Sequence, residues 1–346
     1  MLPLKPMTRK KEKRILITGA AGMIGSALAW RLNREGHDNL ILCDRLGEDA
    51  KWRNLASLRF HEYLDADELA EALRNGSGVL DGVSQVLHMG ACSSTTERDA
   101  GYLMRNNFAY TRELAAWALE RGARFVYASS AATYGDGSAG MADGDAGLDA
   151  LRPLNAYGYS KHLFDLWALR EGLLKRMVGL KYFNVFGPNE HHKGEMRSVV
   201  YKAHEEIRRS GRVSLFKSHH PDYLDGCQMR DFLYVKDAVD MTLHLARSPM
   251  AGGLYNLGSG QARTWRDLVT PIFHALGRPV EIDYIDMPEH LRGKYQYFTE
   301  ADISRLRASG YDRELTPLAT AVTDYVSNYL ETGRHLGDEP ENRSVR

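Results

Sequence analysis

Apolar runs and helical periodicities alternate along the first half of the chain. Short runs such as 14–18 (RILIT) and 83–88 (VSQVLH) end at polar or glycine residues and predict buried strands. The predicted strands are residues 14–18, 39–43, 83–88, 124–128 and 178–183. The helices predicted between them are residues 24–35, 106–121 and 157–174. Strands that alternate with helices predict a Rossmann-type, doubly wound parallel sheet with both faces covered, an α/β fold.

The pattern changes after Gly187 and Pro188. The elements predicted beyond this point are a loop at 191–198, a helix at 199–210, a loop insertion at 221–229 and strands at 230–235, 254–257 and 280–284. We therefore predict a first domain at residues 14–185 and a smaller C-terminal α/β domain at residues 186–330. The segment near 232–260 is expected to return and pack on the first domain.

Composition and charge narrow the class of protein. The 346 residues carry 45 basic and 45 acidic side chains, so a net charge of zero gives no general attraction to nucleic acid or membrane. No apolar run reaches the roughly 18 residues of a membrane-spanning helix. Three widely spaced cysteines are typical of a reducing cytoplasm. The polar ends, 1–13 and 331–346, predict a disordered leader and a disordered tail.

Two histidine pairs, at 191–192 and 219–220, are candidates for metal ligation. Neither has a cysteine or an acid at a fixed spacing, so we predict loops and no metal. Cys92 has no base assigned to it by the sequence, so we expect a small packing residue there and no nucleophile.

A glycine-rich turn follows the first predicted strand. Gly19, Gly22 and Gly25 have the spacing G-x-x-G-x-x-G, with Met23 and Ile24 opening the predicted helix. Glycines let the backbone approach a pyrophosphate, and the start of a helix supplies unpaired N–H groups and partial positive charge. The turn therefore predicts a dinucleotide site, and a tight turn of small residues is the alternative. The first domain would then be the dinucleotide-binding domain.

Charged residues follow the second predicted strand. Asp44, at its end, is placed to accept hydrogen bonds from the adenosine ribose hydroxyls. Arg45 and Lys51 suit the 2′-phosphate of NADP, whereas Asp44 would repel it, and a solvated loop also explains both cations. We predict NADP as the cofactor, with NAD as the alternative.

Tyr157 and Lys161 lie four residues apart in a predicted helix, so the phenol and the ammonium share one face. Free tyrosine has a pKa of about 10. A lysine cation beside it favours the phenolate and is expected to lower that pKa. Such a pair can exchange a proton with a hydroxyl or a carbonyl. Taken alone, the pair is better explained as two exposed helix residues, so the proton-exchange hypothesis depends on the rest of the sequence.

Ser130 ends a predicted strand, at the edge that carries active sites in open α/β sheets. A serine there can hydrogen-bond the reacting oxygen while Tyr157 exchanges its proton. The order glycine-rich loop, Ser130, Tyr157 and Lys161 resembles the extended short-chain dehydrogenase/reductase superfamily, whose members work on nucleotide sugars. The resemblance covers about residues 14–330, and it implies that these three residues form a catalytic triad.

Three stretches narrow this resemblance: 88–97 (HMGACSSTTE), 182–194 (YFNVFGPNEHHKG) and 292–296 (RGKYQ). They resemble the ADP-L-glycero-D-manno-heptose 6-epimerase family, which makes the heptose donor for the lipopolysaccharide inner core. The resemblance implies a cytoplasmic isomerase that holds NADP throughout its cycle. It also implies a homo-oligomer, with a homopentamer by analogy, and no nucleic-acid or membrane partner.

The resemblance assigns roles to individual residues. It implies that Tyr157 and Lys193 are the two acid/base groups, one on each face of the sugar carbon. Epimerisation by redox removes hydride from C6, turns the ketone over and returns hydride to the other face, so the new hydroxyl meets a different side chain. Residues implied beside the nicotinamide are Met89, Gly90, Ala91, Cys92, Ser93, Asn106 and Val185. Residues implied to bind the nucleotide sugar are Asn184, Glu195, Lys202, Phe216, Lys217, Arg230 and Tyr295.

Several positions depart from the family pattern. Ala66 stands where some members carry a lysine near the 2′-phosphate, and Lys202 stands where relatives carry a histidine. Glu195 stands where others have a serine, and its carboxylate is unfavourable near a diphosphate unless it points away. Residues 219–228 are inserted relative to the shortest members.

Two other functions stay open. The first is another nucleotide-sugar enzyme of the same superfamily. A dehydratase would lack its acid, because 131–133 (AAT) occupies the place of an Asp-Glu pair, and a 4-epimerase would not need Lys193. The second is a non-catalytic dinucleotide-binding protein, and the intact triad argues against it.

Overall fold

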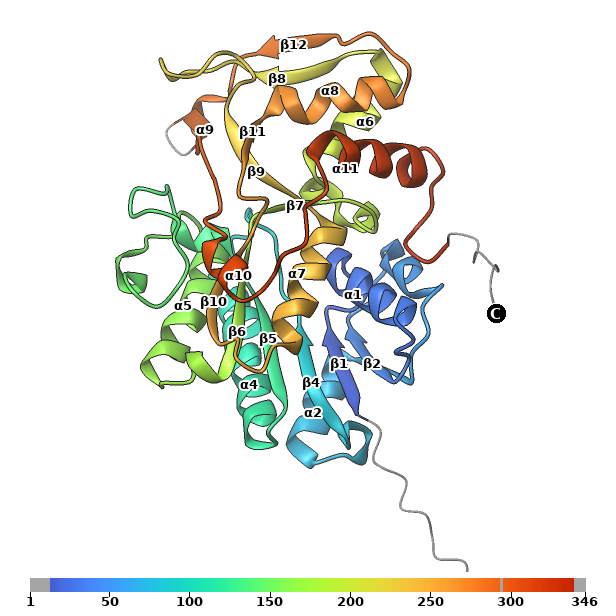
Figure 1. Ribbon diagram of the computed structural model, residues 1–346, viewed down its shortest axis with the longest axis vertical. Coiled ribbons are helices and arrows are strands. Elements are labelled where there is room, and N and C mark those ends of the chain that lie inside the picture. The colour runs from blue at the N-terminus through green and yellow to red at the C-terminus, as the bar shows by residue number, and fades with distance from the viewer. Residues whose placement is uncertain (1–12, 293–294, 339–346) are drawn as a thin grey trace, which may run out of the picture.

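Apolar strands form one seven-stranded parallel sheet in the lower part of the molecule (Figure 1), in the order β10-β6-β5-β4-β1-β2-β3. The structure is a computed structural model that describes residues 13–292 and 295–338. The strands of this sheet are β1 (Arg14–Thr18), β2 (Leu40–Asp44), β3 (Glu62–Asp65), β4 (Val83–His88), β5 (Arg124–Ser130), β6 (Met177–Tyr182) and β10 (Gly253–Leu257). The doubly wound α/β prediction is confirmed.

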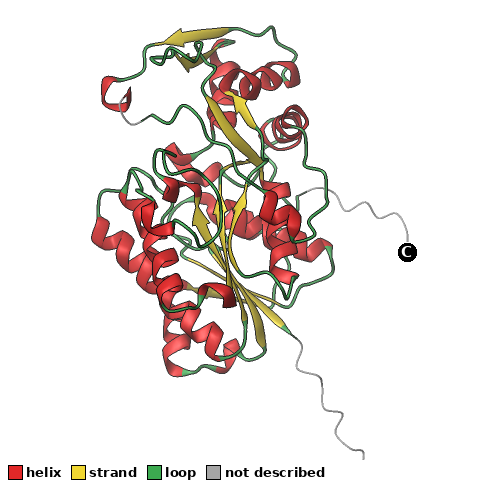
Figure 2. Cartoon of the chain, turned by 60° about the vertical axis from the view of Figure 1, so that its left-hand side comes forward, coloured by secondary structure: helices red, strands yellow, loops and turns green. Residues whose placement is uncertain are grey.

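Helices cover both faces of the sheet, as the turned view in Figure 2 shows. One face carries α1 (Met23–Arg34) and α7 (Val235–Arg247), which pack together. The other face carries α2 (Ala66–Asn75), α3 (Ala100–Leu103), α4 (Tyr110–Glu120) and α5 (Ala156–Arg170). Side chains alternate between the two faces of a strand, so Leu16 and Ile17, which are neighbours in β1, pack into the hydrophobic cores on opposite faces of the sheet. Both side chains are fully buried.

The upper part of Figure 1 holds two small sheets and the helices packed on them. Its strands are β7 (Asn184–Phe186), β8 (Val213–Phe216), β9 (Met229–Tyr234), β11 (Ala262–Thr264) and β12 (Ile282–Ile285), in the orders β11-β9-β7 and β12-β8. Its helices include α6 (Val199–Ser210), α8 (Trp265–Ala275), α9 (Glu289–Arg292) and α11 (Leu318–Tyr325). Among the described residues, no helix combines the length and the apolar character needed to cross a membrane.

The chain passes between the two parts more than once. After β9 it enters α7 and then β10, which pairs in parallel with β6 at the edge of the large sheet. A later short helix, α10 (Ser304–Ala308), packs against β10. The segment near 232–260 therefore contributes to both parts, while the domain limits at 185 and 330 stay a prediction.

Two helices differ in extent from those predicted. The chain is helical from Ala100, through a π-helical turn at Met104–Ala109, to the end of α4, whereas the sequence predicted a start at residue 106. The earlier start follows from Asp99, whose carboxylate accepts a hydrogen bond from the backbone N of Tyr102 at 2.8 Å. The helix predicted to reach residue 174 ends at Arg170, because Gly172 takes a left-handed φ of +67°.

The disordered tail predicted for 331–346 is wrong for residues 331–338. Leu336 is only 1% exposed, and its backbone N donates to Asn189 Oδ1 at 2.9 Å. His335 Nδ1 lies 2.6 Å from Asn54 Oδ1. Polar composition was misleading here because these polar groups find partners in the folded chain. The rest of the predicted tail, 339–346, and residues 1–12 of the predicted leader lie outside the described residues.

Candidate active site

The strand order reverses at β1, which lies between β2 and β4. The helices that follow β1 and β4 cover opposite faces of the sheet, and open α/β sheets bind their ligands at the carboxyl ends of the strands beside such a reversal. Residues 19–25 follow β1, residues 89–93 follow β4, and Ser130 ends β5. The sequence predicted site residues in all three places, and the parallel sheet brings them to one edge.

The glycine loop after β1 fits closely against neighbouring backbone. A Cβ atom on Gly19 would lie 2.6 Å from the N of Gly90, and one on Gly25 would lie 2.1 Å from the O of Gly19. Gly19 also has a φ of +64°. α1 begins after Gly22 with no side-chain cap and no acid in its first turn, so its N–H groups are available to a phosphate. The loop therefore fits the pyrophosphate of a dinucleotide.

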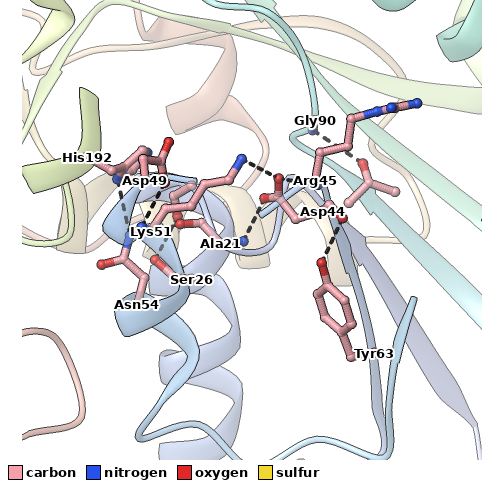
Figure 3. Close-up of polar contacts among 12 residues, drawn as sticks. Ala21, Ser26, Asp44, Arg45, Asp49, Lys51, Asn54, Tyr63, Gly90 and His192 are labelled. Carbon is pink, nitrogen blue, oxygen red and sulfur yellow. Dashed lines mark hydrogen bonds and ion pairs between the residues drawn. The ribbon is translucent and has the colours of Figure 1, made fainter. Parts of the chain in front are cut away.

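Asp44 joins the glycine loop to a lysine, as Figure 3 shows. Its Oδ2 accepts a hydrogen bond from the N of Ala21 at 2.8 Å, and its Oδ1 accepts one from Lys51 Nζ at 2.9 Å. Lys51 belongs to a 3₁₀ helix, η1 (Ala50–Leu55). Arg45 instead pairs with Asp67 at the start of α2, where both side chains are well exposed. The predicted cofactor residues Asp44 and Lys51 thus contact each other, and Arg45 points to a different carboxylate.

The backbone after β4 packs against the glycine loop. Gly90 N donates to Thr18 Oγ1 at 3.3 Å, and Met89 Sδ accepts from the Tyr182 hydroxyl at 3.5 Å. The backbone N and O of Cys92 both bond to the Asn107 side chain, each at 2.9 Å. Ala91 is partly buried beside them, and Ser93 is exposed.

Asn107 was not among the predicted site residues, although its neighbour Asn106 was. It is 1% exposed, and its Nδ2 also donates to Ser160 Oγ on α5 at 3.0 Å. The π-helical turn brings both asparagines onto the loop, with Asn106 Nδ2 donating to Asn107 Oδ1 at 2.9 Å. No signal in the sequence marked Asn107, because the predicted helix began at Asn106 and asparagine is common at a helix start.

The three predicted triad residues lie on two neighbouring elements. Ser130 ends β5, and its hydroxyl hydrogen-bonds the phenol of Tyr157 near the start of α5. Lys161, one turn further along α5, is 5% exposed, and its Nζ donates to the carbonyl O of Ala128 at 2.7 Å. The Ser130 hydroxyl therefore lies beside the Tyr157 phenol.

One electrostatic expectation for the triad is wrong. Burial raises the pKa of Tyr157 above its ordinary value, with the Ser130 hydrogen bond opposing, and Lys161 makes no resolved contribution. Burial also lowers the pKa of Lys161 to about 8, opposed by the carboxylate of Asp165. Desolvation of both groups outweighs their mutual effect because both sit inside the protein.

Beneath the triad lies a buried network that the sequence did not reveal. Asp165 is fully buried and accepts hydrogen bonds from Tyr127 at 2.8 Å, Ser129 at 2.7 Å and Lys181 at 3.1 Å. Lys181, 1% exposed, also donates to Thr133 Oγ1 at 2.6 Å. Asp165 follows Lys161 by one turn of α5, so the network connects α5 to β5 and β6.

Lys193 lies in a 3₁₀ turn, η7 (His191–Met196), between β7 and α6. Burial lowers the pKa of its ammonium, and the carboxylate of Glu190 opposes this. Among residues 13–292 and 295–338, no hydrogen bond or ion pair reaches Lys193 Nζ. A partly buried ammonium with a lowered pKa and no partner is typical of a reactive group.

Some predicted substrate residues gather in the upper part of the molecule. The guanidinium of Arg230, 7% exposed, stacks over the rings of Tyr295 at 5.1 Å and Trp265 at 5.8 Å. Phe216 meets the Tyr295 ring edge-on at 6.5 Å. Lys217, next in sequence, pairs with Asp286 at 3.3 Å.

The other predicted substrate residues lie apart from this cluster or contact each other. Lys202 Nζ donates to the backbone O of Glu195 at 2.5 Å and lies 3.4 Å from its carboxylate, whose side chain is 97% exposed. Asn184 is exposed on β7, with the partly buried Val185 beside it. The carboxylate of Glu195 therefore points into solvent, the orientation in which it does not oppose a diphosphate.

The insertion at 219–228 packs through aromatic rings. His220, Tyr223 and Tyr297 form a mutual cluster with ring centroids 5.1–5.4 Å apart. Tyr297 also meets Tyr295 edge-on at 5.3 Å, so the insertion extends the cluster around Arg230. In the described part of the chain, no three His, Cys, Asp or Glu side chains form a group able to hold a metal ion.

Comparison with known proteins gives the class first. Residues 15–258 match the family model described as the NAD dependent epimerase/dehydratase family, so the chain belongs to that family. It is 53% identical over 315 residues to the ADP-L-glycero-D-manno-heptose-6-epimerase of Nitratidesulfovibrio vulgaris (strain DP4), covering 91% of this chain and 97% of that one.

Two further matches carry the same name. The protein of Fusobacterium nucleatum subsp. nucleatum is 44% identical over 325 residues, covering 91% of this chain and 98% of that one. The crystal structure of the Helicobacter pylori ADP-L-glycero-D-manno-heptose-6-epimerase superposes with a TM-score of 0.75 at 26% identity, covering 94% of this chain and 99% of that one.

Proposed function

We propose that the chain is an ADP-L-glycero-D-manno-heptose 6-epimerase that interconverts the D-glycero and L-glycero forms of ADP-D-manno-heptose with a retained NADP. Its relatives at 44–53% identity carry that name. The observation that carries the proposal is the second candidate acid/base group, Lys193, beyond the Ser130–Tyr157 pair. A reaction that deprotonates the same carbon-bound oxygen from two directions needs two such groups.

The chain's own residues divide the work in this proposal. The cradle of Gly19, Gly22 and Gly25 would hold the pyrophosphate, and the bound nicotinamide would accept a hydride from C6 and return it. Tyr157 takes or returns the proton of the C6 oxygen in one epimer, with Ser130 holding that oxygen. Lys193 does the same for the other epimer.

Binding of the nucleotide sugar rests on the cluster around Arg230. Within the described part of the chain, the buried guanidinium of Arg230 makes one hydrogen bond, to the O of Met229 at 2.8 Å, so it has further N–H groups to offer a diphosphate. Tyr295 and Phe216 supply apolar surface beside it. Asn184 and Lys217 complete the proposed contacts, and Glu195 and Lys202 border them.

The choice of NADP over NAD rests on Lys51. Its ammonium is held at Asp44, where the adenosine ribose is expected, and a 2′-phosphate there would add a second anionic partner. Arg45 can swing from Asp67, because both side chains are exposed. We expect Lys51→Ala to weaken NADP binding roughly 10- to 100-fold more than NAD binding. Mass spectrometry of the dinucleotide released from the purified protein checks the choice directly.

The reaction is tested by NMR of ADP-D-glycero-D-manno-heptose incubated with the purified protein and no added cofactor. We expect conversion to the L-glycero epimer, with no build-up of reduced cofactor. Tyr157→Phe and Lys193→Met should each reduce the rate at least 100-fold. Absence of conversion after adding both NADP and NAD would contradict the proposal.

The rival functions predict other outcomes. A 4-epimerase would turn over a UDP-hexose and would keep most of its rate in Lys193→Met. A non-catalytic protein would retain a dinucleotide and turn over no nucleotide sugar. The 53% identity over most of the chain favours the heptose substrate over both.

The proposed activity implies a place in the cell. The product would supply the heptose of the lipopolysaccharide inner core, made in the cytoplasm from a soluble nucleotide sugar. We also propose a homo-oligomer, with a pentamer as the expected assembly. Native mass spectrometry of the purified protein would show whether the mass corresponds to five chains.

A further inference from the structure

The loop that carries Lys193 begins with a strained residue. Among the described residues, Asn189 is the one non-glycine residue with a positive φ, at 71°. Such a conformation persists only where its surroundings hold it. Asn189 is fully buried, its Nδ2 donates to Ser26 Oγ on α1 at 2.9 Å, and its Oδ1 accepts from the N of Leu336 at 2.9 Å.

Asn54 connects this loop to the dinucleotide site. It is 1% exposed, and its Nδ2 donates to the carbonyl O of Asn189 at 3.0 Å and to the carbonyl O of Ala21 at 2.8 Å. Ala21 is the glycine-loop residue whose N donates to Asp44. Asn54 is also three residues from Lys51 on η1, and Figure 3 shows both side chains beside Ala21. One amide group thus bonds the cofactor loop and the Lys193 loop together.

The strained residue and Lys193 are joined by a short, fixed path. Glu190 is fully buried, and its carboxylate accepts from the N and Oγ of Ser198, both at 2.6 Å, and from the hydroxyl of Tyr325 at 2.9 Å. The N of Lys193 donates to the carbonyl O of Glu190 at 3.0 Å. A displacement of Asn189 is therefore expected to move Lys193, because a single 3₁₀ turn with fixed contacts separates the two residues.

We propose that Asn54 is a positioning residue that couples the dinucleotide-binding loop to the second acid/base group, Lys193. The inference rests on the proposed two-base epimerase. Among the described residues, no hydrogen bond joins Asn54 to Tyr157, whose helix lies on the other face of the sheet. Its loss should therefore impair the half of the reaction that uses Lys193 and spare the half that uses Tyr157.

The alternative is that Asn54 only stabilises the fold, and a matched variant separates the two roles. Asn33 is also buried, at 7% exposed, and its side chain also joins two segments, with bonds to His37 O at 2.9 Å, Arg59 O at 2.8 Å and Arg59 N at 2.7 Å. None of these contacts reaches the Lys193 loop. Asn33→Ala therefore removes a comparable amide without the coupling.

The test measures single-turnover reduction of the retained cofactor, at the nicotinamide absorbance, with each heptose epimer separately. Lys193→Met identifies the epimer whose oxidation depends on Lys193. We expect Asn54→Ala to slow oxidation of that epimer roughly 10- to 100-fold and to leave the other within about threefold. Asn33→Ala should change both epimers equally. Equal effects on both epimers in Asn54→Ala would overturn the proposal.

A second readout does not depend on activity. Reductive methylation with ¹³C-formaldehyde makes the titration of Lys193 visible by NMR in the full-length protein. We expect the midpoint of Lys193 to rise towards that of an ordinary lysine in Asn54→Ala and to stay unchanged in Asn33→Ala. An unchanged midpoint in both variants would overturn the coupling, whereas failure of the wild-type protein to interconvert the two epimers would contradict the proposed function instead.

Discussion

Single residues in this site have chemical properties set more by burial than by their sequence neighbours. Tyr157, Lys161 and Asp165 follow one another at four-residue spacing on α5, so the sequence could place them on one face. The partner of Asp165 could not be found that way, because Lys181 comes from β6 and reaches it only in the folded chain. The direction of the pKa shift of Tyr157 was also predicted wrongly, because the sequence pattern does not show that this side chain is buried.

The first prediction concerns pH. Burial lowers the pKa of Lys161 to about 8, so its ammonium is lost as the pH rises through 8. If a protonated Lys161 is needed beside Tyr157, kcat falls above about pH 8. In the unfolded chain a lysine titrates near 10.4. Between about pH 8 and pH 10.4 the unfolded chain therefore binds more protons at Lys161 than the folded chain does. The contribution of this group to the free energy of unfolding therefore rises with pH in that range. A rate loss in that window is therefore not unfolding caused by Lys161.

Lys161→Arg distinguishes this explanation from a general alkaline effect. A guanidinium stays protonated above pH 12, so the alkaline fall in kcat should move to higher pH, whatever the absolute rate. The exposed Lys175→Arg is the control and should keep the original profile. If kcat of Lys161→Arg falls at the same alkaline pH as that of the unmodified protein, the fall is caused by the titration of another group.

The second prediction concerns the buried pair Asp165–Lys181. Asp165→Asn leaves an ammonium that is 1% exposed without its counter-charge, so we expect the free energy of unfolding to fall by roughly 3–5 kcal/mol. The control is Asp149→Asn, which breaks the exposed 3.9 Å pair with Arg170 and should cost at most about 1 kcal/mol. Urea unfolding of both variants gives the comparison. Equal losses would mean that the buried pair has no special role.

At the scale of elements, strands with apolar sequences were predictable, and short or polar strands were not. β1 and β6 are largely apolar runs, which is the pattern of a covered parallel sheet. β3 is four residues long at the sheet edge, with its first residue exposed. α8 contains Pro271, which reads as a helix breaker in sequence.

The C-terminal segment is the clearest element that sequence reasoning missed, and it carries the third prediction. Leu336 is 1% exposed in an otherwise polar stretch, so Leu336→Ala should cost about 2–4 kcal/mol. Leu224→Ala, at a side chain 76% exposed, should cost less than about 0.5 kcal/mol. Thermal or urea unfolding measures both. A negligible loss at Leu336 would mean that residues 331–338 do not contribute to the fold.

The whole molecule is held together by contacts between distant parts of the chain around the dinucleotide loop. Asn54, Asn189 and Leu336 are joined by hydrogen bonds across more than 280 positions. Motif spacing could predict the glycine loop and the triad, because each lies within one strand–helix unit. It could not predict this junction, because its members share no pattern along the sequence.

The fourth prediction follows from that junction. A ligand that binds only the folded state stabilises it by about 2.7 kcal/mol at a hundredfold excess over Kd. Removing the dinucleotide should therefore lower Tm by roughly 5 °C, and adding NADP should restore more of the loss than adding NAD at the same concentration. Because Ala21, Asn54 and His335 link the site to both ends of the chain, the unfolding transition should stay single in both states. Lys51→Ala is the matched variant, since it should abolish the difference between NADP and NAD while retaining stabilisation by either. Equal recovery with the two dinucleotides in the unmodified protein would contradict the preference for NADP, and a split transition would mean that the two parts of the molecule unfold independently.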